Sequence, residues 1–187
     1  MGDPKKQRKK YSSPSKRWEK ERIDREKSLI KEYGLKNKKE IWKAESRLRN
    51  FTRQAKRLIA ITTKQAEKEK EQLLLKLKSL SLLPMTANME NILDLDLKSI
   101  LDRRLQSLVY KKEMARSVKS ARQMVTHGHI LVDKTKVTIP SYLVQLKEES
   151  SITVNSNSPF SDSLHPEMKK DKKTIKEKDK KTIKVEK

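Results

Sequence analysis

The chain has 187 residues and not one of them is cysteine. This absence excludes disulfide bridges, thiolate zinc sites and cysteine nucleophiles together, and it fits a reducing compartment. Glycine occurs three times and histidine three times. No Walker-type phosphate loop, no Gly-x-Gly-x-x-Gly and no His-Glu-x-x-His motif is present. The sequence therefore offers none of the common motifs for nucleotide binding or zinc hydrolysis.

Long apolar runs are also missing. No stretch reaches the roughly 18 apolar residues that a membrane span requires. The first residues, MGDPKKQRKKY, are followed by no apolar segment, so they do not form a signal peptide. We expect a cytoplasmic protein without a membrane partner.

Acidic residues are outnumbered by basic ones. Lysine and arginine total 47 against 25 aspartate and glutamate residues, a formal charge of +22. Such a charge repels itself unless a partner neutralises it, and nucleic acid is the abundant polyanion for a basic protein. Only 33% of the residues are hydrophobic and 4% aromatic. We therefore expect a thin core and a chain that becomes partly ordered on its partner.

The sequence of the N-terminal half predicts a basic arm followed by helices. Residues 1–17 combine cations, prolines and serines with almost nothing to bury. Sparse apolar residues predict one helix over 18–34, with Gly34 as its stop. Apolar residues spaced by three and four predict an amphipathic helix over 38–60. The leucine-rich stretch 73–84, which ends at a proline, predicts a second helix that packs on the first.

The helix over 38–60 contains a run of cations with no acid between residues 46 and 57. A solvated helix face usually alternates in sign, as QAEKEKEQ (65–72) does here. A face of cations alone is better explained by contact with phosphates. We expect this contact from Arg47, Arg49, Arg53, Lys56 and Arg57.

A second module follows the linker 85–92. Residues 92–112 and 114–128 both show helical spacing, with Ser117 as a candidate N-cap. Beyond Gly128 the period changes to two, which predicts short strands joined by tight turns. The expected strands are HILVD (129–133), KVTIP (136–140), YLVQL (142–146) and SITV (151–154). The expected fold class is α+β, with a helical N-terminal region, a helix pair with a small β-sheet, and a disordered lysine-rich tail.

The division of the chain follows from these shifts in composition. The tail contains a nearly perfect repeat, DKKTIKEK and then DKKTIKVE, without any burial pattern. We expect it to add nonspecific affinity and little shape. The parts are a basic arm (1–17), a helical RNA-binding region (18–90), a helix-pair and sheet module (91–154), an extension (155–168) and a low-complexity tail (169–187).

The pair His127 and His129, separated by a glycine, has two interpretations. Neither a nearby carboxylate nor a third histidine completes a tetrahedral metal site, and nothing pairs with either ring for general base catalysis. Gly128 can instead take the left-handed conformation that ends a helix before a strand. Both rings then lie near the surface, where they can stack or hydrogen-bond with RNA.

Residues 103–144 contain, in this order, an Arg-Leu-Gln helix, an Ala-Arg-Gln helix, His-Gly-His-Ile and a hairpin ending in Pro-Ser. This pattern closely resembles the RNA-binding module named after ribosomal small-subunit protein four. Outside the module, EYGLKNKKEIWKAE and RLRNFTRQAKRLIA resemble the archaeal form of the ribosomal protein itself. The resemblance covers roughly residues 1–168. Its matching positions are Arg103, Arg104, Leu105, Gln106, Ala121, Arg122, Gln123, His127, Gly128, His129, Ile130, Val132, Pro140, Ser141 and Tyr142.

Membership in that family implies a structural role in the small ribosomal subunit. It implies early binding to small-subunit ribosomal RNA in the 5′ domain, contact with small-subunit protein five with an effect on translational accuracy, and proximity to the path by which mRNA enters. Some bacterial members bind zinc through N-terminal cysteines, which this chain lacks, so no metal or other cofactor is expected. The chain also has Lys-Glu-Met-Ala at 112–115 where the family pattern has Lys-Gly-Leu-Ala, which leaves the role of Glu113 open.

We expect no enzymatic activity and no small-molecule substrate, and a cytoplasmic, ribosome-bound location. Two alternatives stay open, a free RNA chaperone or ribosome-associated factor, and an RNA-modifying enzyme that uses the same module. Affinity should come mainly from cations on phosphates. The expected RNA-binding residues are Arg47, Arg49, Arg53, Arg57, Arg103, Arg104, Lys111, Arg116, Lys119, Arg122, His127 and His129.

Overall fold

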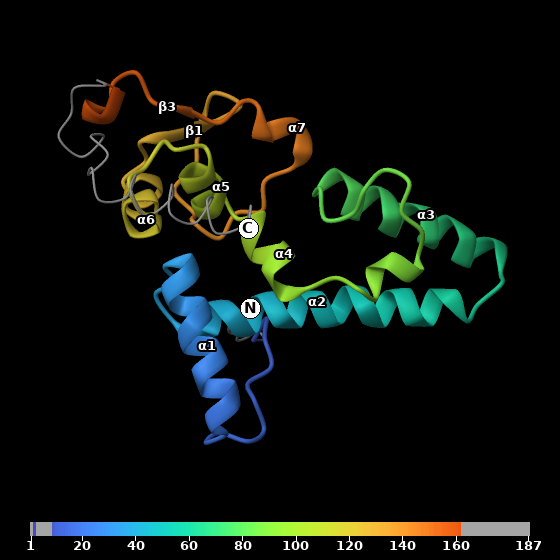
Figure 1. Cartoon of the computed structure of the whole chain (residues 1–187). Coiled ribbons are helices and arrows are strands. Elements are labelled where there is room, and N and C mark those ends of the chain that lie inside the picture. Colours follow the sequence, from blue (N-terminus) through green and yellow to red (C-terminus); the bar gives the residue numbers. More distant parts are fainter. Residues whose placement is uncertain (1, 3–8, 162–187) are drawn as a thin grey trace, which may run out of the picture. The chain divides into compact units, whose positions relative to one another are not determined.

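The computed structural model describes Gly2 and residues 9–161 (Figure 1). The chain divides into two compact units. The first contains the residues up to Arg104 together with Leu143–Lys147, and the second contains Leu105–Tyr142 and the residues from Glu148 onward. The predicted lysine-rich tail and most of the extension before it lie outside the described residues.

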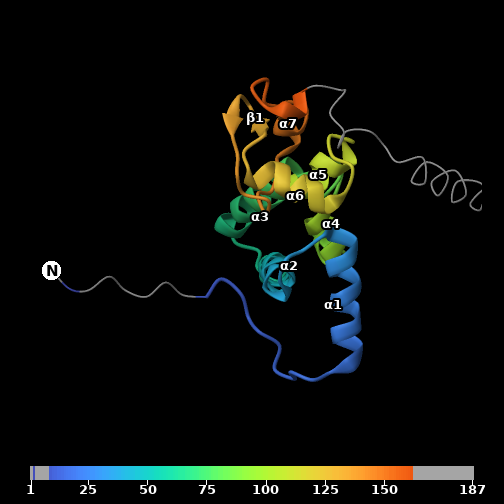
Figure 2. The ribbon, with the colours of Figure 1, turned by 90° about the vertical axis from the view of Figure 1, so that its left-hand side faces the viewer.

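Two of the predicted helices of the first unit are confirmed. Helix α1 (Lys20–Tyr33) ends at Gly34, whose φ of 55° is the left-handed conformation expected of a glycine stop. Helix α2 (Lys38–Ile59) follows after a short connection and has the predicted length. Figure 2 looks almost along α2 and shows α1 standing beside it.

Helix α3 (Lys64–Ser79) begins earlier and ends sooner than the leucine-rich stretch predicted. Its start is fixed by Thr63, whose side chain accepts a hydrogen bond from the Ala66 N–H at 3.2 Å. Its end comes before Pro84 because Ser81 takes a φ of 52° and the chain turns there. Buried Leu73 and Leu77 join α3 to the core beside α2, along which it runs back (Figure 1).

The core of the first unit is formed by the apolar faces of these helices and by the segment that follows them. A short 3-10 turn, η1 (Glu90–Ile92), leads into α4 (Leu97–Asp102). Ile92 and Leu101 are fully buried, so this connection is part of the core and no loose linker. The central buried side chains are Ile41, Ala55, Leu77, Ile92, Ile100 and Leu101.

The single helix predicted over residues 92–112 is wrong, because the structure has two helices there. Helix α5 (Leu105–Lys111) begins a new axis after α4. The Leu105 N–H donates to the carbonyl oxygen of Tyr142 at 2.8 Å, where a continuous helix would bond it to the preceding turn. Helix α6 (Val118–Thr126) has Ser117 as its N-cap, as predicted, with the hydroxyl oxygen accepting from the Ser120 N–H.

A small antiparallel sheet completes the second unit and confirms the α+β fold class. It contains β1 (Ile130–Val132), β2 (Thr135–Lys136) and β3 (Thr153–Val154), in the order β2-β1-β3. Leu131 pairs with Lys136 on one side and with Thr153 on the other. Ile130 and Val132 point to the core, which Leu105, Val109, Ala121, Val125 and Ile152 also fill.

The strand predicted over 136–140 is shorter than expected and the strand predicted over 142–146 is absent from this sheet. Strand β2 contains only Thr135 and Lys136, after which the Val137 N–H still bonds to Ile130, and YLVQL contributes a single bridge from Leu143 to Arg104. The chain then turns into α7 (Leu146–Glu149). Proline cannot donate to a ladder, so Pro140 interrupts pairing between the two runs. A last 3-10 turn, η2 (Pro159–Ser161), ends the described chain.

Candidate nucleic-acid interface

The outward face of α2 carries the cations that the sequence singled out. Arg47, Arg53, Lys56 and Arg57 are all exposed. Within the described part of the chain none of them forms an ion pair with an acid. This is the arrangement expected of side chains kept available for phosphates.

This face is fixed by the residues on the opposite side of the same helix. Ile41 and Ala55 are fully buried and Phe51 nearly so, which leaves the cations between them in solvent. Arg49 differs from the other cations because it bonds to its own unit. Its guanidinium lies 3.3 Å from Glu45 and 3.2 Å from the Ser12 hydroxyl, and so also holds the N-terminal segment.

The position of α2 depends on a buried carboxylate in α1. Glu26 is 2% exposed and accepts hydrogen bonds from Trp42 Nε1 at 3.0 Å and Arg22 Nη1 at 2.6 Å. Lys38 Nζ lies 3.2 Å from its second oxygen. Burial alone raises the pKa of such a carboxyl, but the donors from Trp42, Arg22 and Lys38 outweigh it and hold the pKa of Glu26 below its ordinary value.

The sequence predicted Arg103 and Arg104 on a helix, but the structure places them between α4 and α5. Arg104 is 5% exposed and forms an ion pair with Glu40 of α2. Arg103 is half-buried and donates to the carbonyl oxygen of Val144 at 3.1 Å. In this structure Arg104 joins parts of the first unit, and we assign it to the fold and not to the exposed face.

The expected cations of the second unit lie on and around α6. Lys119 is exposed on the helix, and Lys111 is exposed at the end of α5. Arg122 is half-buried, with a guanidinium nitrogen 3.4 Å from the side-chain oxygen of Gln106. Arg116 is exposed but precedes the N-cap Ser117, so it does not share a helix face with Lys119 and Arg122 as predicted.

The two histidines have different environments. Gly128 takes a φ of 75°, and the His129 N–H bonds back to the carbonyl oxygen of Met124, so the chain reverses there as predicted. His127 is exposed. His129 is half-buried, with Nδ1 at 2.9 Å from the Ser158 hydroxyl and its ring edge-on to Phe160. Burial, with the charges of His127 and Lys136, lowers the pKa of His129.

Sequence reasoning missed two residues that position this surface. Gln106 is 1% exposed and bonds both to the carbonyl oxygen of Val118, at the start of α6, and to Arg122. Its place between apolar residues on α5 was the available signal, because a buried amide needs partners. Ser158 was missed for a different reason, since a serine in a turn-rich segment gives no sign of its distant histidine partner.

Other kinds of site have no support among the described residues. No group of three histidine or acidic residues in residues 9–161 is close enough to hold a metal ion. In that same range, no helix combines the length and apolar character needed to span a bilayer. The distinctive feature of the surface is its positive charge.

The sequence of the chain is similar to those of a known family of proteins. A family model described as S4 domain matches residues 103–150, which contain α5, α6 and most of the sheet. The small ribosomal subunit protein uS4 of Picrophilus torridus is 50% identical over 169 residues, covering 89% of this chain and 92% of its own. Its namesakes from Methanococcus aeolicus and Thermoplasma acidophilum are 49% and 46% identical over the same share of this chain, and cover 95% and 85% of their own lengths.

Proposed function

Since the chain belongs to the uS4 family of small ribosomal subunit proteins, we propose that it is a structural protein of that subunit which binds ribosomal RNA early in the assembly of the 5′ domain. The observation that carries this proposal is the outward face of α2. Four of its cations are exposed and form no ion pair with any acid of the described chain. A basic helix face of this kind favours a phosphate-lined partner.

The same premise supports the proposed RNA-binding residues of the second unit. Lys111, Arg116, Lys119, Arg122 and His127 are exposed or half-buried there. Cations supply affinity for phosphates, whereas the fixed spacing between them selects the shape of a folded RNA. We retain Arg47, Arg49, Arg53, Arg57 and Arg103 in the set and give His129 a supporting role.

Family membership also supports finer proposals about partners. The chain contacts small-subunit protein five, affects translational accuracy and lies near the path of incoming mRNA, bound to ribosomes in the cytoplasm. The arm 1–17 and region 18–90 hold the RNA from one side, and the module 91–154 docks its helix pair on the same RNA. The tail 169–187 adds nonspecific affinity and little shape, whereas the start of the extension 155–168 holds His129 through Ser158 and Phe160.

Filter binding to a transcript of the 5′ domain, measured against salt concentration, tests the central proposal. The double variant Arg53→Ala with Arg57→Ala removes two α2 cations that lie one turn apart. We expect affinity to fall about tenfold or more, and the slope of log affinity against log salt to decrease by roughly 1 to 2. Arg116→Ala with Arg122→Ala should act similarly from the second unit.

Lys64→Ala with Lys68→Ala is the matched control, because it removes the same charge at the same spacing from α3. Both lysines are exposed beside acidic residues, on a helix where signs alternate. This control should leave affinity within about threefold of the native chain. Equal losses in control and test variants would mean that net charge alone drives binding, and the proposed interface would be wrong.

A further inference from the structure

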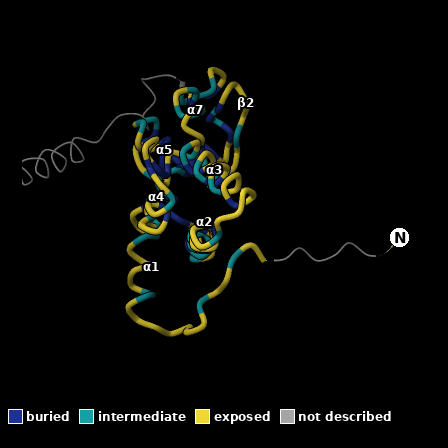
Figure 3. Tube along the Cα trace, turned by 90° about the vertical axis from the view of Figure 1, so that its right-hand side faces the viewer, coloured by how far each residue is buried: buried dark blue, intermediate teal, exposed yellow. Residues whose placement is uncertain are grey.

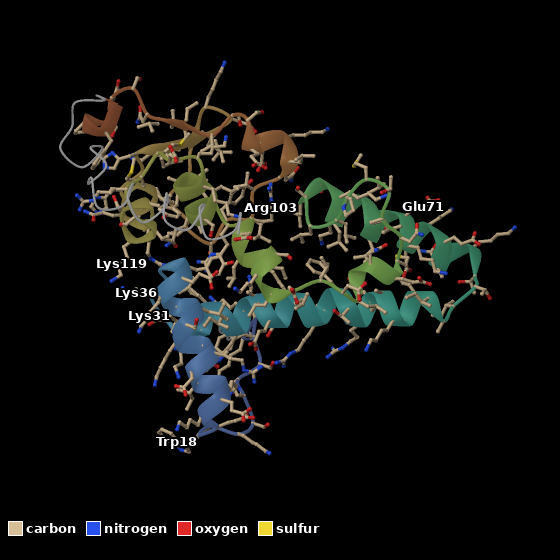
Figure 4. All side chains as sticks on the ribbon, in the orientation of Figure 1. Trp18, Lys31, Lys36, Glu71, Arg103 and Lys119 are labelled. Carbon is tan, nitrogen blue, oxygen red and sulfur yellow. The ribbon has the colours of Figure 1, made fainter. Side chains whose placement is uncertain are left out.

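Trp18 is the most exposed large apolar side chain of the described residues. About 90% of its surface is open to solvent. Its side chain lies at the N-terminal end of α1, away from Lys31 near the other end of that helix (Figure 4). Tryptophan is among the more buried residue types, so a fully exposed indole points to a partner that covers it.

The backbone that presents this indole is held in place. Arg22 Nη2 donates to the carbonyl oxygens of Lys16 and Arg17, at 2.9 Å each. The same guanidinium bonds to Glu26 through Nη1, and Glu26 is buried. The turn that leads into Trp18 is therefore anchored to the interior of the first unit, and ligand contact would not require this turn to be ordered first.

The surroundings of Trp18 suit RNA better than protein. Lys16, Arg17 and Lys20 are exposed next to it, and so are Glu19 and Glu21, of which Glu19 lies 3.8 Å from Arg22. Most of the N-terminal segment and of α1 is exposed as well (Figure 3). No other large apolar side chain of residues 9–36 is exposed. A protein-docking surface presents a cluster of apolar groups, whereas a lone aromatic ring where cations outnumber carboxylates is suited to stack a base and to neutralise its phosphates.

We propose that Trp18 is a stacking platform for an unpaired RNA base, with the flanking phosphates held by Lys16, Arg17 and Lys20. A base within a duplex has both faces covered by its neighbours, so the indole can stack only on a base that is unpaired or at a helix end. The proposal rests on the proposed function and adds a specific contact to it, a base face in place of a phosphate.

Affinity of the full-length chain for the 5′-domain transcript tests the contact through two variants. Trp18→Ala removes the ring, and we expect binding to weaken about tenfold. Because stacking releases no counterions, the salt slope should stay at its native value. Trp18→Phe keeps an aromatic face and should stay within about threefold of native affinity. Both variants should fold normally, since the side chain contacts little, and thermal melts verify this.

Fluorescence provides an independent readout of direct contact. Bound transcript should quench the emission of the native chain. The quench should largely disappear in Trp18→Phe, which retains only the half-buried Trp42. Met85→Ala is the matched control, because Met85 is 73% exposed in the same unit. It should change neither affinity nor quenching. Affinity for a long RNA duplex, in which nearly every base is covered on both faces, should change little in Trp18→Ala.

The outcomes separate this inference from the function on which it rests. Native affinity in Trp18→Ala, together with weak binding by the α2 arginine variant, would overturn the stacking contact and leave the proposed function intact. If Trp18→Ala bound the transcript with native affinity but was incorporated poorly into small subunits, the indole would contact a protein. That outcome would also overturn the stacking contact. If the arginine variants bind normally as well, both proposals fail.

Discussion

Glu113 shows how one residue can carry strain at the end of a helix. It takes a φ of 60°, and the Met114 N–H bonds back to the carbonyl oxygen of Val109 at 3.1 Å, which is the helix-ending motif in which glycine is preferred. The resemblance in sequence gave glycine as the family residue here. The left-handed conformation of an L-residue other than glycine costs roughly 1–2 kcal/mol.

We therefore expect Glu113→Gly to stabilise the protein. The relief of strain exceeds the added chain entropy of glycine in the unfolded state, and the free energy of unfolding should rise by about 0.5–1 kcal/mol. Urea denaturation at neutral pH measures the change. Glu113→Ala is the control, since it removes the carboxylate but keeps the strained conformation. Equal stability of the glycine and alanine variants would show that φ is not the cause.

Gly128 and Arg104 differ in how far their roles could be predicted from the sequence. The turn at Gly128 could be predicted, because a glycine after a periodic helix and before an alternating run has one common use. The burial of Arg104 could not be predicted. Its partner Glu40 lies far away in the sequence, and an arginine in a basic chain gives no local sign that it forms an ion pair inside the fold.

At the scale of elements, α1 and α2 are joined by the Glu26 cluster. The carboxylate has a lowered pKa because the donors from Trp42, Arg22 and Lys38 outweigh the effect of burial. A carboxyl whose pKa is depressed by folding stabilises the fold above its ordinary value of 4.5 and loses that contribution as pH falls through the folded pKa. The contacts of Glu26 that join α1 to α2 should therefore weaken in acid.

Glu26→Gln should destabilise the protein by about 1–3 kcal/mol at neutral pH, because Arg22 and Lys38 lose their counter-charge near the core. The difference from the native chain should shrink as pH is lowered below 4.5 and the native carboxyl becomes protonated. Chemical denaturation over a series of pH values measures both effects.

Glu45→Gln is the control for that series. Burial, with a smaller opposing effect from Arg49, raises the pKa of Glu45, so neutralising it should have little effect at neutral pH. A Glu26→Gln difference that stayed constant down to acid pH would contradict the role of the charge. In that case the loss would come from shape and hydrogen bonding alone.

The elements themselves were predictable to different degrees. Helix α2 was predicted to within a residue because its period extends over six turns. The strands were overestimated because alternation over four or five residues does not distinguish a paired strand from an extended connection. Residues 142–146 alternate well, yet Leu143 and Val144 pair with Arg104 and Arg103, which belong to no strand. Pairing of that kind depends on tertiary structure.

At the scale of the whole molecule, the positive charge is divided between helices of the fold and a low-complexity sequence. The cations of α2 have a fixed spacing along that helix, and those of α6 along theirs, whereas the repeat in 169–187 contains lysines in excess of acids without any burial pattern. Fixed cations can discriminate between RNA folds. A low-complexity run interacts with any polyanion, so its contribution should be the same for every RNA.

Truncation after Met168 tests this division of roles. We expect the affinity for the 5′-domain transcript and for an unrelated RNA of equal length to fall by the same factor, so that their ratio is unchanged. The salt slope should decrease for both RNAs, since fewer counterions are released. Filter binding at several salt concentrations measures all of these quantities. Truncation combined with Arg53→Ala and Arg57→Ala should then reduce the ratio as well, because those cations belong to the shaped surface. A lower ratio from truncation alone would mean that the tail itself recognises the ribosomal RNA.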